Sequence, residues 1–122
     1  MPNYDTLTEE WLAEVLAELG ETRDEVAETL RKAEIKGRRC DPYDCPVTRY
    51  VTSRVMEHLG PSDHATVASC TFVRIELELA GVGYRMLKLR APGPVSDFID
   101  AFDSGRHDGA YADLAEAEEP AA

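Results

Sequence analysis

Thiol and imidazole groups gather in the middle of the chain. They belong to Cys40, Cys45, His58, His64 and Cys70. Such groups are the usual ligands of structural zinc, which takes them as two closely spaced pairs. The Cys-x4-Cys spacing of residues 40–45 has no matching second pair, and His58 falls beside the apolar stripe of a predicted helix. We therefore predict no metal site and no other cofactor.

A reactive thiol is a second chemistry to consider. Cys45 stands directly before Pro46, at the predicted N-cap of a helix, where the helix dipole favours a thiolate. Asp41 and Asp44 oppose that effect because their charges repel a thiolate. Cys70 lies in a predicted strand and has the character of a small buried hydrophobe. We expect structural, reduced cysteines, as is usual in a cytoplasm.

Sequence motifs of the common enzyme classes are missing from the chain. It contains no Gly-x-Ser-x-Gly, no His-Glu-x-x-His and no phosphate-binding P-loop. Residues 81–83, Gly-Val-Gly, lack the third glycine and the strand-to-helix setting of a dinucleotide loop. We therefore predict that the protein is not an enzyme.

Charged residues provide the better candidates for function. The formal net charge is −11, and acidic ends flank a neutral-to-basic middle. Two groups of residues could contact a partner. The first is an acidic helical face, made of Glu10, Glu14 and Glu18. The second is a basic patch, made of Arg38, Arg39, Arg49 and Arg54. Solvated charge on a helix face, and cations near a helix C-terminus, also account for both groups without any partner.

The residues that carry these groups lie on three predicted helices. The first starts at the N-cap Thr8 and ends before Gly20. The second starts with a capping box at Thr22 and runs to about residue 36, before Gly37. The third begins at Pro46, suited to a first helical turn, and ends before the Gly-Pro pair at 60–61.

Alternating apolar residues predict one strand over 66–79, with a bend or break near 69–71, and a returning strand over 84–90. A short amphipathic helix follows Pro94 and is expected to stop at Ser104-Gly105. The predicted core is Trp11, Leu12, Val15, Leu16, Leu19, Val26, Leu30, Val47, Tyr50, Val51, Val55, Leu59, Val73, Ile75, Leu77, Leu89, Phe98 and Phe102.

These elements predict an α+β fold with three N-terminal helices, a two-stranded antiparallel β-hairpin and a short C-terminal helix. Residues 1–111 are expected to form a single domain, which suits a chain of 122 residues. The acidic Ala/Glu-rich tail 112–122 is expected to be frayed or disordered. No apolar run is long enough for a bilayer and no secretory signal is present, so we expect a cytoplasmic protein that does not bind a membrane.

The element order is also that of a winged helix-turn-helix domain. Helix 46–59 would then be the recognition helix, with Arg49, Thr52, Ser53 and Met56 facing DNA. Residues 37–45 are longer than the usual turn of that motif, and the net negative charge opposes phosphate binding. DNA binding is therefore the alternative to a protein partner.

Two segments, 35–51 and 94–105, resemble a known group. Their motifs are the Cys-Pro-Val-Thr-Arg-Tyr-Val start of a helix at 45–51 and the Phe-Asp-Ser-Gly end of another at 102–105. They resemble small uncharacterised proteins of high-GC actinobacteria and their phages, over about half of the chain. The resemblance implies a bacterial or phage cytoplasm and carries over no functional residue. The function that we predict is that of a small non-enzymatic regulatory protein that binds a macromolecular partner, with a protein as the first candidate and DNA as the alternative.

Overall fold

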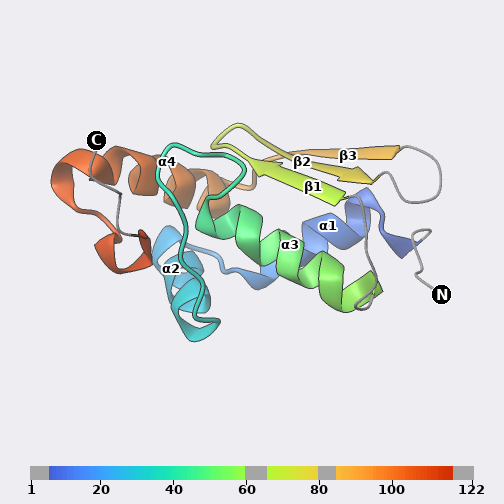
Figure 1. Ribbon diagram of the computed structural model, residues 1–122, viewed down its shortest axis with the longest axis horizontal. Helices are drawn as coiled ribbons and strands as arrows, with labels where there is room; N and C mark the ends of the chain where they lie inside the picture. The colour runs from blue at the N-terminus through green and yellow to red at the C-terminus, as the bar shows by residue number, and fades with distance from the viewer. Residues whose placement is uncertain (1–5, 60–65, 80–84, 117–122) are drawn as a thin grey trace, which may run out of the picture.

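The computed structural model describes residues 6–59, 66–79 and 85–116 (Figure 1). The chain has an α+β fold in which three helices precede a sheet and a fourth helix follows it. The elements are α1 (Glu9–Glu18), α2 (Arg23–Lys32), α3 (Pro46–Leu59), β1 (Thr66–Cys70), β2 (Arg74–Leu79), β3 (Arg85–Arg90), α4 (Gly93–Asp108) and the 3-10 helix η2 (Ala112–Leu114).

The predicted starts of the first three helices are confirmed, whereas α4 starts at Gly93, before the predicted start after Pro94. The Thr8 hydroxyl accepts the N–H of Trp11 at 3.1 Å, and the Thr22 hydroxyl accepts the N–H of Glu25 at 3.2 Å. α3 starts at Pro46 as predicted, and the Cys45 thiol caps it by accepting the N–H of Thr48 at 3.4 Å. Each cap satisfies a backbone donor that the first helical turn leaves without an intrahelical partner.

Two predicted helix ends are wrong. α2 ends at Lys32 because Glu34 takes the left-handed conformation, with φ of 59°, and the N–H of Ile35 then reaches back to the carbonyl of Leu30 at 3.0 Å. This is a Schellman closure in which a glutamate occupies the usual glycine position. α4 continues through the Ser-Gly pair at 104–105 and ends at Gly109, whose φ is 78°.

The sheet has three strands in the order β1-β2-β3, so the predicted two-stranded hairpin is wrong. The expected break within 66–79 reverses the chain, and the two halves of that segment pair antiparallel with each other. The Thr71 side chain makes the reversal, because its hydroxyl accepts the N–H groups of Val73 and Arg74 at 3.3 and 3.0 Å. Residues 80–83, which connect the two strands predicted from the sequence, lie outside the described residues.

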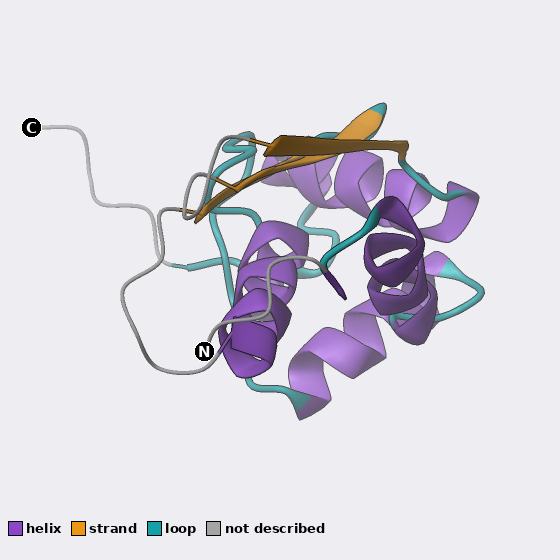
Figure 2. Cartoon of the chain, turned by 90° about the vertical axis from the view of Figure 1, so that its right-hand side faces the viewer, coloured by secondary structure: helices purple, strands orange, loops and turns teal. Residues whose placement is uncertain are grey.

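Within the described chain, the helices pack against one face of the sheet and leave the other face open (Figures 1 and 2). The covered face is apolar. Its buried residues are Ala68, Cys70, Ile75, Leu77, Leu79 and Leu87. Most of the predicted core is buried, and Trp11, Tyr50 and Leu89 lie half-buried at its edge. Val73 was wrongly predicted in the core: it lies beside the turn between β1 and β2 and is 55% exposed.

Residues 112–116, the first part of the predicted tail, contact the helical part of the fold. Leu114 is buried, and its carbonyl accepts the N–H of Gly37 at 2.9 Å. The N–H of Glu116 donates to the carbonyl of Gly37 at 2.8 Å. This segment therefore holds the connection between α2 and α3 in place. The rest of the tail, 117–122, lies outside the described residues.

Candidate protein-interaction surfaces

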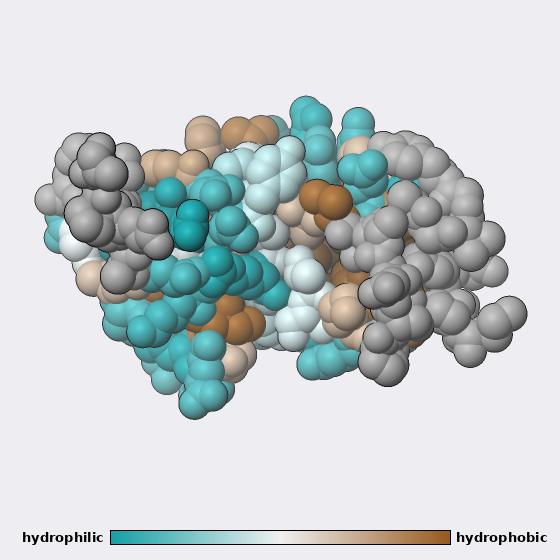
Figure 3. Space-filling view, in the orientation of Figure 1, coloured by the Kyte–Doolittle hydropathy of each residue, from teal (hydrophilic) through white to brown (hydrophobic). Residues whose placement is uncertain are grey.

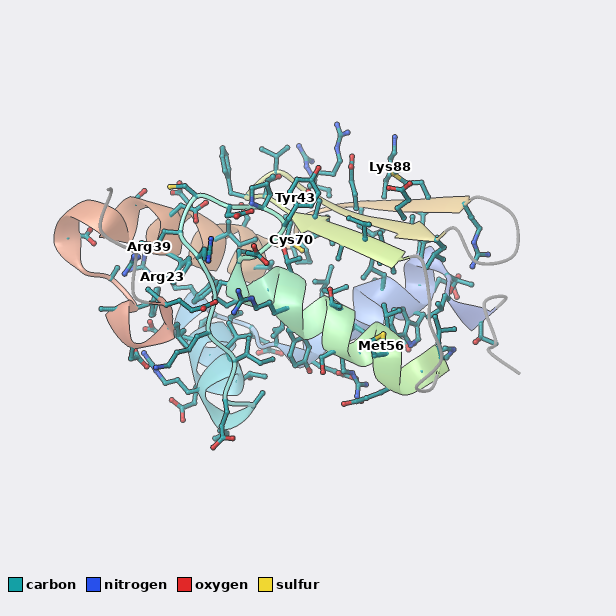
Figure 4. All side chains as sticks on the ribbon, in the orientation of Figure 1. Arg23, Arg39, Tyr43, Met56, Cys70 and Lys88 are labelled. Atoms are coloured by element: carbon teal, nitrogen blue, oxygen red, sulfur yellow. The ribbon has the colours of Figure 1, made fainter. Side chains whose placement is uncertain are left out.

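Hydrophilic side chains cover much of the face that carries α2 and the connection to α3 (Figure 3). The basic residues predicted to bind a partner lie on this connection and on α3. Arg39 turns inward: its guanidinium stacks over the Phe102 ring at 4.7 Å and donates to the Phe102 carbonyl (Figure 4). Arg38 is exposed, and its backbone N–H donates to the carbonyl of Asp44 at 2.8 Å. The connection is therefore tied to α4 through Arg39 and also through Cys40, whose backbone N–H donates to the Asp103 carboxylate at 2.8 Å.

The two arginines of α3 are engaged by neighbouring carboxylates. Arg49 pairs with Glu116 and, at 3.8 Å, with Asp44. Arg54 pairs with Glu57 at 2.9 Å and with Glu18 of α1 at 3.1 Å. Their charges are thus largely balanced within the fold. The four predicted basic residues do not form one free cationic patch.

The N-terminal turn of α3 is buried. Pro46, Val47 and Thr48 are all buried, and the Thr48 hydroxyl donates to the carbonyl of Pro42 at 2.5 Å. A DNA recognition helix contacts base edges with the residues of its N-terminal part. α3 packs against β1 and also contacts α1 and α2 (Figure 1). The helix that the winged-helix alternative requires therefore offers neither a free N-terminal turn nor unpaired arginines.

The predicted acidic face of α1 is arranged differently. Glu10 and Glu14 are exposed, and neither forms an ion pair with another described residue. Glu18 accepts hydrogen bonds from Arg54 at 3.1 Å and from the Tyr50 hydroxyl at 3.2 Å. The α1 acidic face, Glu10, Glu14 and Glu18, is therefore free at its N-terminal part and fixed by α3 at its C-terminal part.

The three cysteines differ in their exposure to solvent. Cys40 is exposed, whereas Cys45 and Cys70 are buried, with the Cys45 sulfur 3.9 Å from the Cys70 carbonyl oxygen. A hydrogen bond from the Cys70 thiol lowers the pKa of Cys45, and donors of Thr48 and Val47 at the start of α3 add to this against the opposing effect of burial. The contact with Cys45, together with burial, raises the pKa of Cys70. This pair serves the core and the cap of α3.

The imidazole of His58 packs against the Trp11 ring, with 5.4 Å between the ring centroids. It also contacts the Thr6 hydroxyl. His64 lies outside the described residues. Within the described ranges, no group of three His, Cys, Asp or Glu side chains is placed to hold a metal ion.

Sequence reasoning missed a surface at the end of the sheet where β1 turns into β2. Tyr43, Phe72 and Val73 are exposed there, at 61%, 53% and 55%. Next to them lies a hollow lined by Val73, Arg74, Lys88, Leu89 and Arg90. This surface was missed because the sequence analysis did not predict a chain reversal at 71–73. Such a reversal places Phe72 and Val73 at the turn between two strands and aligns Arg74 with Arg90 on adjacent strands.

No protein-family model, no curated protein and no solved structure matches this chain. Among the helices that the structure describes, none is both long and apolar enough to span a membrane.

Proposed function

We propose that this chain is a small non-enzymatic interaction protein that binds a protein partner through the α1 acidic face. One observation carries the proposal. Glu10 and Glu14 are exposed and have no ion pair with any residue in the described ranges, whereas Arg49 and Arg54 are paired. Free charge on this part of the surface is therefore negative.

The chemistry of this face favours a basic segment of a partner. Glu10 and Glu14 lie one helical turn apart, so their carboxylates project from the same side of α1. Ala13 and Ala17 are exposed beside them and leave room for a long lysine or arginine side chain. Arg54 and the Tyr50 hydroxyl hold Glu18 in one position, which lowers the entropy lost when a partner binds it. An inhibitor of a nucleic-acid-binding enzyme is one version of this function.

Charge reversal tests the proposal. Glu10→Lys with Glu14→Lys should abolish capture of a lysine- and arginine-rich protein partner from a bacterial lysate without changing the circular dichroism spectrum. The matched control is Asp97→Lys with Asp100→Lys, which makes the same charge change at exposed positions of α4. Capture that survives the α1 change, or is lost equally in the control, would remove this face from consideration.

The same preparation tests the winged-helix alternative. Salt-sensitive binding to DNA fragments, lost on changing Arg49 and Arg54 to Ala, would favour it. We expect no such complex, because both arginines are paired and the first turn of α3 is buried. We place the binding in a cytoplasm, in line with the resemblance of residues 35–51 and 94–105.

A further inference from the structure

Three exposed apolar side chains lie at one end of the sheet. Phe72 and Val73 stand at the turn between β1 and β2, and Tyr43 lies on the loop before α3 (Figure 4). A hydrogen bond at 3.0 Å from the N–H of Cys70 to the carbonyl of Pro42 holds that loop against the end of β1. The Ser96 hydroxyl donates to the Phe72 carbonyl at 2.5 Å and fixes the turn against α4. Apolar atoms are visible at this edge in Figure 3. The backbone that carries these exposed side chains is thus bonded to β1 and to α4.

Cations line the hollow beside this cluster. Arg74, Lys88 and Arg90 surround it together with Val73 and Leu89. Lys88 projects from the open face of the sheet, away from the helices (Figure 4). Arg74 pairs with Glu76 at 3.2 Å, but Lys88 and Arg90 form no ion pair with a described residue. A protein of net charge −11 therefore keeps two unpaired cations at this hollow.

Arg74 and Arg90 stand directly opposite each other on adjacent strands. The N–H of Ala91 donates to the carbonyl of Val73, so the pair at 73 and 91 is a hydrogen-bonded one. The next pair, Arg74 with Arg90, is then a non-hydrogen-bonded pair, in which side chains lie closer together. Like charges in such positions repel and destabilise the sheet. A bound anion would remove that repulsion.

The same register leaves a free backbone edge. β3 is the last strand of the described sheet, and its hydrogen bonds to β2 are made by alternate residues. The backbone groups of Met86, Lys88 and Arg90 therefore point to the outer edge. An extended peptide can add to such an edge through main-chain hydrogen bonds while its side chains occupy neighbouring pockets.

We propose that this end of the sheet binds an extended acidic peptide segment of a protein partner, with carboxylates at Lys88 and Arg90 and an apolar side chain on Phe72 and Val73. Charge complementarity selects the occupant, because the hollow is cationic and its neighbours are apolar. A nucleic acid fits less well, since the whole molecule is strongly acidic and repels a polyphosphate chain. This surface is separate from the α1 acidic face, so the protein has two binding surfaces of opposite charge.

The test is fluorescence anisotropy of the full chain with a labelled octapeptide of Asp and Glu around one central Phe. We expect Arg90→Gln to weaken its binding about tenfold, the effect of losing one charge-assisted hydrogen bond. Lys32→Gln also removes one positive charge, at an exposed position of α2, and should leave the affinity for the peptide unchanged. Glu10→Lys with Glu14→Lys should also leave it unchanged, which separates this site from the proposed function.

Three further probes define the occupant. Replacing the peptide's Phe with Ser should weaken binding, and methylating its alternate backbone nitrogens should abolish it. A labelled single-stranded DNA of similar charge should bind more weakly than the peptide. The proposal is overturned by undetectable peptide binding, by equal affinities of Arg90→Gln and Lys32→Gln, by tighter binding of the DNA, or by methylation without effect.

Discussion

Tyr111 links the end of the chain to α2. Its hydroxyl donates to the Asp24 carboxylate at 2.6 Å, and its ring packs on Phe98 with 5.1 Å between centroids. Burial, with the hydrogen bond to Asp24 and the charge of Asp24, raises the pKa of Tyr111 from 10.0 to about 12. Tyr111 holds this contact even though its backbone takes a left-handed φ of 54°.

The raised pKa gives a prediction about alkaline stability. The folded state holds the Tyr111 proton more tightly than the unfolded state, so this contribution is complete below pH 10 and is lost as the pH rises toward 12. Tyr111→Phe removes the hydrogen bond and should cost about 1 kcal/mol at neutral pH. Urea denaturation at pH 8 and 11 measures the loss, which should be smaller at pH 11. Tyr43→Phe is the control, because Tyr43 is mostly exposed. Equal effects of the two changes would contradict the prediction.

At this scale, the sequence predicts contacts that are local. The caps Thr8 and Thr22 were predicted because their partners lie three residues on. The partners of Arg39 and Arg49 were not, because Phe102 and Glu116 come from the far end of the chain. Arg39 and Arg49 therefore link distant parts of the chain, and the four predicted basic residues do not form one free cationic patch.

The connection between α2 and α3 depends on one glycine. A Cβ at Gly37 would lie 2.5 Å from the carbonyl oxygen of Asp44 and 2.5 Å from the nitrogen of Pro46, both backbone atoms. Gly37→Ala should therefore force the backbone apart and lower the free energy of unfolding by about 3 kcal/mol. Gly93→Ala is the matched control, because a Cβ at Gly93 meets nothing within 4 Å.

Chemical denaturation followed by circular dichroism compares the two glycine variants. Gly93→Ala should raise the free energy of unfolding by about 0.5 kcal/mol. Gly93 stands in the first turn of α4, and alanine there reduces the conformational entropy of the unfolded chain. A Gly37→Ala protein as stable as the Gly93→Ala protein would show that the connection can move without cost.

The sheet itself offers a prediction on Arg90. Removing one charge of the Arg74–Arg90 pair should stabilise the folded protein, because like charges directly opposite are unfavourable by about 0.2–1 kcal/mol. Arg90→Gln should thus raise the midpoint of urea denaturation even though it weakens binding of the acidic peptide. Added salt should shrink the difference by screening the repulsion. A lower midpoint for Arg90→Gln would mean that the arginine serves the fold.

The number of strands could not be read from the sequence. Residues 66–79 alternate almost throughout, and Thr71 replaces the glycine, proline or asparagine that usually marks a reversal. Its hydroxyl closes the turn through backbone bonds that only the folded geometry reveals. The α+β class was nevertheless predictable, because helix and strand periodicity differ clearly along the chain.

On the scale of the whole molecule, negative and positive charges gather on different surfaces. The α1 acidic face and the cationic hollow beside β3 belong to different elements and carry opposite signs. The arginines of α3 add little free charge to either surface, because carboxylates pair with them. This separation would let the protein hold two partners of opposite charge at once, because each surface repels the other's partner.

The C-terminal segment closes the fold, and this leads to a prediction about truncation. A protein ending at residue 111 loses the buried Leu114, both backbone bonds to Gly37 and the 2.6 Å ion pair between Arg31 and Asp113. We expect a loss of about 3 kcal/mol in the free energy of unfolding, mostly from the leucine and the unpaired N–H of Gly37.

The matched control for that truncation ends at Glu116 and keeps every one of these contacts. Urea denaturation monitored by the single tryptophan, Trp11, compares the two proteins. Leu114→Ala in the full chain should reproduce most of the loss, because the leucine side chain is its largest part. Equal stability of the two truncated proteins would mean that residues 112–116 rest on the fold without supporting it. A selective loss would mean that the connection between α2 and α3, together with the arginines it carries, is held from the far end of the chain.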